Sequence, residues 1–234
     1  DLYKSGRVAA SLMNLVLSKG QIAIVHIDES LKNAVHMQEK EKGFRNYFDE
    51  KKLIDMFADS KTLGVDMFLL DDGWFGNKYP RSGDKSGLGD WQATKTKLPN
   101  GIGFLMQEAE KTGIKFGIWI EPEMVNPKSE LYEKHPEWVL KLPNRPESYY
   151  RTQLVLDLCN PQVQDFVFKT VDDIMQTKQG VAFFKWDCNR MMTNAYSAYL
   201  KNQQSHLFIE YTRGLYKVLD RIKTKYPNLP MMLC

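Results

Sequence analysis

Acidic residues follow short apolar runs at four separate places in this chain. Each run has the length and composition of a strand that is buried on both faces of a parallel sheet. Because the carboxyl ends of parallel strands meet at one edge, the side chains after the runs should gather there. The runs and their acids are 65–70 with Asp71 and Asp72, 115–120 with Glu121 and Glu123, 153–156 with Asp157, and 181–186 with Asp187.

The stretches between these runs have helical spacing of apolar residues. Asp49 and Asn160 are placed to cap two of the helices, and Pro161 occupies the favoured first helical position. Strand and helix therefore alternate, which predicts a parallel α/β fold, either a closed (β/α)8 TIM-type barrel or a doubly wound sheet. We expect helices over 49–63, 101–112, 127–135, 161–178 and 203–225.

Two observations favour the barrel. Nearly every expected strand ends in polar or acidic residues, which is where barrel active sites are built. No Gly-x-Gly-x-x-Gly pattern follows the first strand. A complete barrel needs eight βα units, and we count about strands 1–6, with the first at 21–27 and the last starting at 231–234. We expect an incomplete barrel over 45–234, truncated at its C-terminus, after a poorly assigned segment, 1–44, with a helix at 8–17.

Composition argues against several classes of function. The net charge is only +3 and no basic block is interleaved with aromatic residues, so a nucleic-acid partner is not expected. No apolar run is long enough to span a bilayer, so no membrane partner is expected. The three cysteines are odd in number and lack metal-ligand spacing, which favours a reducing, cytoplasmic compartment. We expect no cofactor and no metal.

Clustered acids with few histidines leave two chemistries open. One is a divalent cation site with oxygen ligands, and the other is carbohydrate chemistry, in which carboxylates grip hydroxyl groups. Trp74, Trp91 and Trp119 lie on or beside the same strand ends and favour a sugar, whose C–H faces pack on indole rings. Alternation along a strand also places Lys185 and Asp187 on one face.

Seven segments of the chain resemble glycoside hydrolase family 36, the α-galactosidases or melibiases with the related raffinose and stachyose synthases. The resemblance implies a (β/α)8 barrel, a retaining double displacement and α-galactoside oligosaccharides of the melibiose and raffinose type as substrates, with a homo-oligomer as one state of the full-length enzyme. The segments are LLDDGWFG (69–76), LGDW (88–91), KLPNGI (97–102), GIKFGIWIEPEMVNP (113–127), HPEWVL (135–140), RTQLVLDLCNP (151–161) and FKWDCNR (184–190).

The same resemblance assigns roles to individual residues. Asp187 corresponds to the nucleophile, and Lys185 would keep it ionised while holding sugar hydroxyls. Glu121 and Glu123 could support the site or simply bond to loop amides. The remaining substrate-binding assignments are Asp71 and Asp72 to the galactose O4 and O6 hydroxyls, Trp74 beside the ring, Trp91 over the non-reducing sugar, Arg151 reaching the ligand, Asn189 near the nucleophile, and Cys234.

The resemblance places the general acid/base outside this chain. In the family it is an Asp that follows a Cys-Ser-Gly-Gly-Gly stretch, and Cys234 corresponds to the first residue of that stretch. We therefore expect the chain by itself not to hydrolyse α-galactosides. The alternatives to an α-galactosidase are an α-galactosyl transferase of the raffinose-synthase type, a non-catalytic sugar-binding fragment and a metal-dependent barrel hydrolase.

Overall fold

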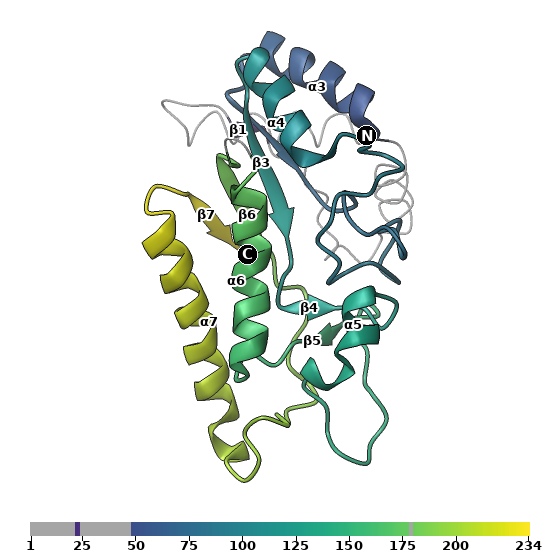
Figure 1. Cartoon of the computed structure of the whole chain (residues 1–234), viewed down its shortest axis with the longest axis vertical. Coiled ribbons are helices and arrows are strands. Elements are labelled where there is room, and N and C mark those ends of the chain that lie inside the picture. Colours follow the sequence, from purple (N-terminus) through teal and green to yellow (C-terminus); the bar gives the residue numbers. More distant parts are fainter. Residues whose placement is uncertain (1–21, 24–47, 178–179) are drawn as a thin grey trace, which may run out of the picture.

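A five-stranded parallel sheet forms the centre of the protein, in the order β1-β2-β3-β6-β7 (Figure 1). The computed structural model describes residues 22–23, 48–177 and 180–234. The strands are β1 Ile22–Ala23, β2 Met67–Leu70, β3 Lys115–Ile120, β6 Phe183–Trp186 and β7 Met231–Leu233. The register pairs Leu70 with Ile118 and Ile120 with Trp186, so these strands end close to one edge.

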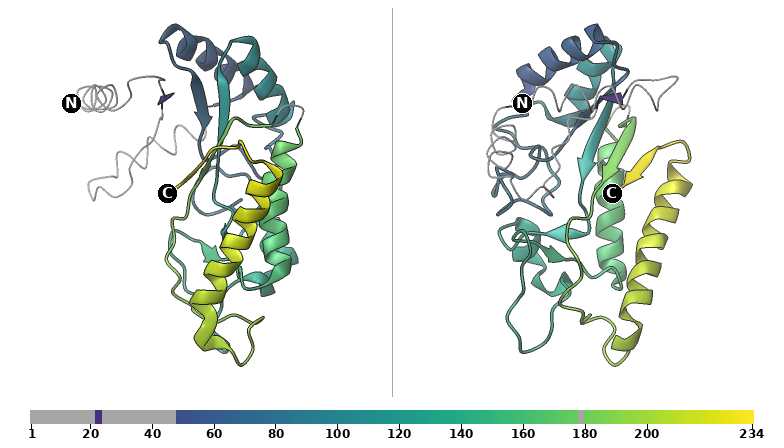
Figure 2. Two further views of the ribbon diagram at one scale, coloured as in Figure 1. Left: turned by 90° about the vertical axis from the view of Figure 1, so that its left-hand side faces the viewer. Right: turned by 180° about the vertical axis from the view of Figure 1, so that it is seen from behind.

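Helices follow the strands as the sequence predicts. The Asp49 side chain caps the first by accepting from the Lys52 amide at 2.9 Å, and Asn160 caps another by accepting from Gln162 at 3.0 Å. Figure 2 shows that α4, α6 and α7 lie along the same side of the sheet. The long helices are α3 Glu50–Thr62, α4 Gly101–Lys111, α6 Pro161–Met175 and α7 Leu207–Lys225.

The two faces of the sheet have different environments. Phe57 of α3 makes edge-to-face contacts with Phe68 and Phe116, at ring-centroid distances of 5.0 and 6.0 Å, so this face packs under helices. On the other face a Cβ added at Gly117 would lie 3.3 Å from the side chains of both Leu69 and Phe183. Alternation then places Trp119 and Lys185 on this second face, towards the carboxyl ends.

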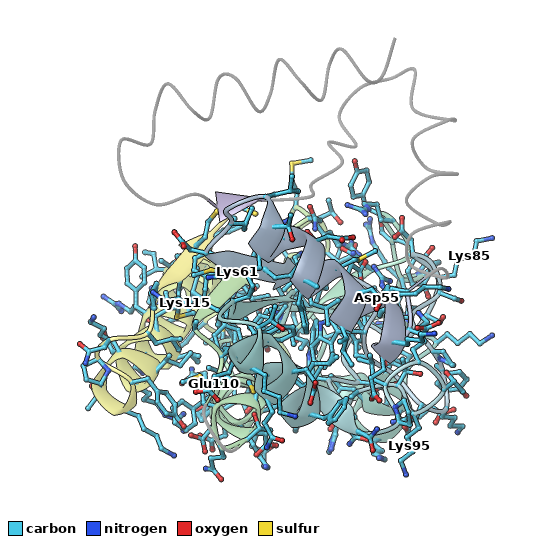
Figure 3. All side chains as sticks on the ribbon, turned by 90° about the horizontal axis from the view of Figure 1, so that it is seen from above. Asp55, Lys61, Lys85, Lys95, Glu110 and Lys115 are labelled. Atoms are coloured by element: carbon cyan, nitrogen blue, oxygen red, sulfur yellow. The ribbon has the colours of Figure 1, made fainter. Side chains whose placement is uncertain are left out.

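Charge is exposed on the helices and at the amino-terminal end of β3. Asp55 and Lys61 of α3, Glu110 of α4 and Lys115 at the start of β3 are all solvent-exposed (Figure 3). Buried charges follow the carboxyl ends of the strands instead, at Asp72, Glu121 and Asp187. Charged side chains are therefore buried at this one edge of the sheet, although burial of a charge is costly. Among the described residues, no helix combines the length and apolar character needed to cross a bilayer.

One expected strand of the parallel sheet lies elsewhere. The segment 153–156 contributes β5 Leu154–Val155, which pairs antiparallel with β4 Met124–Val125, while β3 and β6 are direct neighbours. The described sheet therefore has five strands rather than about six. The run is too short to form a full strand, because Arg151 and Thr152 before it have positive φ and the chain turns at Asp157.

The other differences lie in the shorter elements. The helix expected over 127–135 is α5 Glu130–Lys134, with Ser129 as its cap, followed by the 3₁₀ turn η1 Pro136–Trp138. A second 3₁₀ turn, η2 Gln204–His206, precedes α7. Of the strand expected at 21–27, the structure describes Ile22–Ala23 as β1; the rest of it and the helix expected at 8–17 lie outside the described residues. Parallel strands with helices on one face confirm a partial α/β barrel.

Candidate active site

Asp187 lies directly after β6 and is held by four hydrogen-bond donors. Its Oδ2 accepts from Trp119 Nε1 at 3.0 Å and from Asn189 Nδ2 at 2.7 Å. Its Oδ1 accepts from the Cys188 amide at 2.9 Å and from Cys234 Sγ at 3.5 Å. The residue is 9% exposed. The orientation of the carboxylate is therefore fixed, while a small part of it can reach a bound molecule.

Lys185 forms a partly buried ion pair with Asp71. Its Nζ lies 3.0 Å from Asp71 Oδ2, and the side chains are 3% and 21% exposed. The other Asp71 oxygen accepts from the Asp72 amide at 2.8 Å. A donor cation and an acceptor carboxylate thus stand side by side at the edge of the sheet, which is an arrangement that suits neighbouring sugar hydroxyls.

Arg81 is a site residue that the sequence reasoning missed. Its guanidinium clamps Asp72, with Nε 3.0 Å from Oδ1 and Nη2 2.9 Å from Oδ2, and the Arg81 side chain is 1% exposed. Its Nη1 also donates to Asn126 Oδ1 at 3.2 Å. The signal that could have found it is an arginine in the loop after Asp72, because a planar guanidinium matches a carboxylate with two parallel bonds.

The structure brings the three expected tryptophans together. Trp91 has ring-centroid distances of 6.1 Å to both Trp74 and Trp119, and Phe75, which the sequence reasoning did not single out, lies 4.5 Å from Trp91. Trp74 is 1% exposed and its Nε1 donates to the Trp119 carbonyl at 2.9 Å. Trp91 is only partly buried, so it offers the accessible part of this aromatic cluster.

Arg151 lies in a strained part of the backbone. Arg151 and Thr152 have φ values of 50° and 57°, in the left-handed region that costs a non-glycine residue on the order of 1–3 kcal/mol. Neighbouring groups hold this conformation: Arg151 Nη2 lies 3.5 Å from Asp84 Oδ1, and Asn126 Nδ2 donates to the Thr152 carbonyl at 2.7 Å. Asn126 also binds the Asp84 carbonyl at 2.9 Å, so it joins the two loops.

Glu121 and Glu123 are both buried but have different partners. Glu121 Oε1 accepts from the Asn189 amide at 2.6 Å, and burial raises the pKa of Glu121 to about 8. Glu123 accepts from Trp186 Nε1 at 3.0 Å and from the Tyr211 hydroxyl at 2.7 Å, and burial raises its pKa as well. Glu121 thus bonds to the loop that carries Asp187, while Glu123 ties the sheet to α7.

The hydrogen bonds that the structure shows for the Asp157 side chain go to residues other than Asp187, Glu121 and Glu123. Its oxygens accept from the Cys159 amide at 3.0 Å and from Ser197 Oγ at 2.5 Å. Within residues 48–177 and 180–234, no three His, Cys, Asp or Glu side chains are grouped as ligands of a metal ion would be.

These features define a β/α-barrel protein with acidic residues and a cluster of tryptophans at the carboxyl ends of its strands. The chain belongs to the Melibiase family, whose sequence model matches residues 32–234.

Named relatives agree with this assignment. α-Galactosidase AgaA of Geobacillus stearothermophilus is 40% identical over 188 residues, which is 80% of this chain and 25% of that protein. α-Galactosidase 1 of Pediococcus pentosaceus is 40% identical over 183 residues, 78% of this chain and 24% of that protein. The chain thus spans about a quarter of the length of these relatives.

Solved structures show the same fold. The crystal structure of AgaA matches with a TM-score of 0.76 at 40% identity, over 80% of this chain and 26% of that one. The α-galactosidase from Lactobacillus brevis matches with a TM-score of 0.76 at 39% identity, over 80% of this chain and 25% of that one. Variants of AgaA have been crystallised in complex with raffinose and with stachyose.

Proposed function

We propose that this chain carries the nucleophile and much of the galactose-binding site of a retaining α-galactosidase. The observation that carries the proposal is the setting of Asp187, a carboxylate with four donors that lies two residues after Lys185, which is itself paired with Asp71. The substrates would be α-galactoside oligosaccharides of the melibiose and raffinose type, in keeping with the raffinose and stachyose complexes of the AgaA variants.

The proposed reaction has two displacements at the anomeric carbon. The Asp187 carboxylate attacks C1 of the galactose, the bond from C1 to the leaving oxygen breaks, and a β-linked galactosyl ester forms. Water then attacks C1 and releases Asp187, so the two inversions give net retention. Asp187 suits the attack because its donors fix the carboxylate in one orientation before the sugar arrives.

The reaction also needs a general acid/base about 5–5.5 Å from the nucleophile, which protonates the leaving oxygen in the first displacement and takes a proton from the attacking water in the second. We assign this role to no carboxyl group of the described residues. Glu121 is bonded to the Asn189 amide and Asp157 to Cys159 and Ser197.

Recognition of galactose would depend on groups with fixed directions. Asp71 accepts from hydroxyls while Lys185 donates to them, and Arg81 holds Asp72 in place beside them. A hydroxyl that points the wrong way would leave a buried charge unpaired, which is why such sites reject epimers. The other proposed contacts are Trp74, Trp91, Arg151, Asn189 and Cys234.

Because Cys159, Cys188 and Cys234 are all free thiols, we also propose a cytoplasmic location.

Inhibition by free sugars tests the proposed site. In the full-length protein, galactose should inhibit hydrolysis of an aryl α-galactoside more strongly than glucose by on the order of 10²-fold or more. The variant Asp71→Asn should reduce this preference. Asp66→Asn, a change of an exposed residue beside the start of β2, should keep it. Equal inhibition by the two sugars in the unchanged protein would contradict the proposal. Chromatography of the products with added sucrose would separate hydrolysis from transfer to a sugar.

A further inference from the structure

A closed ring of hydrogen bonds joins the Asp187 loop to the loop that carries Arg151. Glu121 Oε1 accepts from the Asn189 amide at 2.6 Å, and Glu121 Oε2 accepts from Gln153 Nε2 at 3.2 Å. The ring closes through Arg190, whose Nη1 donates to the Gln153 carbonyl. Glu121 itself extends from the end of β3 and is completely buried.

Two members of this ring, Asn189 and Gln153, lie next to residues that the proposed reaction needs. On one side, Asn189 also donates from Nδ2 to Asp187 Oδ2 at 2.7 Å. On the other side, Gln153 directly follows Arg151 and Thr152, which have left-handed φ values. Such a conformation persists only where the surroundings impose it. One buried carboxyl group is therefore bonded to both loops.

We propose that Glu121 is a positioning residue that holds the nucleophile Asp187 and the sugar-binding Arg151 in register with each other, a role that rests on the function proposed above. It would act without touching the substrate. Its two oxygens fix the amide of Asn189 and the side chain of Gln153, and these residues in turn set the places of Asp187 and Arg151.

Burial favours the neutral acid form of Glu121, which is completely buried and whose two hydrogen-bond donors, Asn189 and Gln153, are both uncharged. The side-chain Oε1 of Gln153 is buried and has no hydrogen-bond partner among the described residues. In the orientation found, Gln153 Nε2 donates to Glu121 Oε2; with the Gln153 amide turned over, a protonated Glu121 donates its O–H to Gln153 Oε1 instead, and its carbonyl oxygen still accepts from Asn189. A carboxylate would have no proton to give. Burial agrees with this, because it raises the pKa of Glu121 to about 8.

The charged groups around Glu121 include some that raise its pKa and one that lowers it. From the loop after β6, Asp187 raises the pKa of Glu121; Cys188 in the same loop has its own thiol pKa raised to about 12 and stays neutral near pH 8. From the loop after β2, Asp72 raises the Glu121 pKa and Arg81 lowers it. Above about pH 8, ionised Glu121 would place a second negative charge near Asp187 and lose its proton bond to Gln153.

The variant Glu121→Gln separates this role from simple packing. Glutamine keeps the shape, offers an oxygen to the Asn189 amide and, with the Gln153 amide turned over, an N–H to Gln153 Oε1, and it cannot ionise. We would measure kcat/KM of the full-length protein on an activated aryl α-galactoside between pH 5 and pH 9.5. The variant should keep kcat/KM within about threefold of the unchanged protein at pH 6, and its alkaline fall should move to higher pH. Superimposable pH profiles, or inactivity of the variant at every pH, would overturn the proposal.

Two further variants complete the test. Glu121→Ala removes both contacts and should lower kcat/KM on the order of 10²-fold, the size of effect expected from small misplacements of reacting groups. Full activity in this variant would also overturn the proposal. Glu123→Gln is the matched control, because Glu123 is also buried but bonds to Trp186 and Tyr211. It should leave the midpoint of the alkaline fall unchanged.

Hydrogen–deuterium exchange measures the coupling between the two loops and does not depend on catalytic turnover. In Glu121→Ala, amide exchange should rise in both 148–153 and 187–190, whereas Glu123→Gln should not raise it in 148–153. A rise in neither loop of the alanine variant would overturn the positioning role. If the unchanged protein does not hydrolyse α-galactosides, the proposed function fails, and the exchange result still decides whether Glu121 holds the two loops together.

Discussion

The Lys185 Nζ lies 3.0 Å from Asp71 Oδ2, although 114 positions separate the two residues. Lys185 lies within β6 and Asp71 directly follows β2, and these two strands are not neighbours, because β3 runs between them. The pair therefore reaches across β3 on the face that carries Trp119, the register partner of Lys185. Charges from two separated strands are thus paired on one face of the sheet, which means that this part of the proposed site is formed before any ligand binds.

Replacement of Asp187 by alanine should abolish turnover of α-galactosides, by on the order of 10³-fold or more, because no other group could attack C1. With added azide and an activated aryl α-galactoside, the variant should form the β-galactosyl azide, since azide would enter from the vacated face. Product analysis by nuclear magnetic resonance gives the anomeric configuration.

The matched control for this variant is Asp157→Asn. It changes a carboxylate that is also buried, at 2% exposure, but that bonds to Cys159 and Ser197 instead of to groups around Asp187. The control should lose some stability and keep its turnover. Appreciable hydrolysis by Asp187→Ala, or formation of the α-azide, would refute the nucleophile assignment.

Replacement of Arg81 by alanine should lower the free energy of unfolding by about 3–5 kcal/mol, because it leaves the buried Asp72 carboxylate without its cation. Arg81→Lys should recover only part of this loss, since an ammonium group cannot bond both oxygens in parallel. Arg213→Ala breaks an ion pair with Glu210 in which the arginine is 65% exposed, and it should change stability little. Urea unfolding of the three variants measures these differences, and similar losses for Arg81→Ala and Arg213→Ala would contradict the expectation.

Glu121 should make the stability of the protein fall as the pH rises. The pKa of Glu121 is about 8 in the folded protein against an ordinary value of 4.5, so between these values the folded state holds a proton that the unfolded state has lost. The free energy of unfolding therefore decreases with pH across this window, by about 1.4 kcal/mol for each pKa unit of difference.

Glu121→Gln should remove this dependence. The variant should match the unchanged protein near pH 4.5 and become progressively more stable than it up to about pH 8, where the difference levels off. Urea unfolding at pH 5, 6.5 and 8 checks the trend. A stability difference that does not vary with pH would show that Glu121 does not hold its proton in the folded protein.

Gly214 of α7 should not tolerate a side chain. A Cβ at this position would lie 2.0 Å from the carbonyl oxygen of Leu158, so Gly214→Ala must move α7 away from the turn before α6. We expect a loss of about 1–3 kcal/mol in the free energy of unfolding. Gly83→Ala is the control, because nothing lies within 4 Å of the added Cβ, and it should change stability little. Equal effects of the two changes would argue against close packing of α7 at Gly214.

The sequence by itself determined the alternation of strands and helices. The local signals are apolar runs at β2, β3 and β6, capping residues such as Asp49 and Asn160, and the stops at Gly64 and Gly113, and the structure confirms each. The resemblance of seven segments, among them those around Asp71 and Asp187, also predicted the family. Local chemistry was sufficient for these conclusions.

Only the tertiary structure decided which side chains meet. The segment 153–156 looks like another strand of the sheet, but the direct pairing of β3 with β6 leaves it to β4. Asp71 and Asp72 are adjacent in the sequence, yet one pairs with Lys185 and the other with Arg81. Glu121 and Glu123 lie two residues apart in one motif but bond to different partners. The reason is that the strand ends at Ile120, so the alternation of side chains along β3 no longer applies to them. The physical reason is that ion pairs and buried hydrogen bonds depend on distances between elements, which spacing along the chain does not contain.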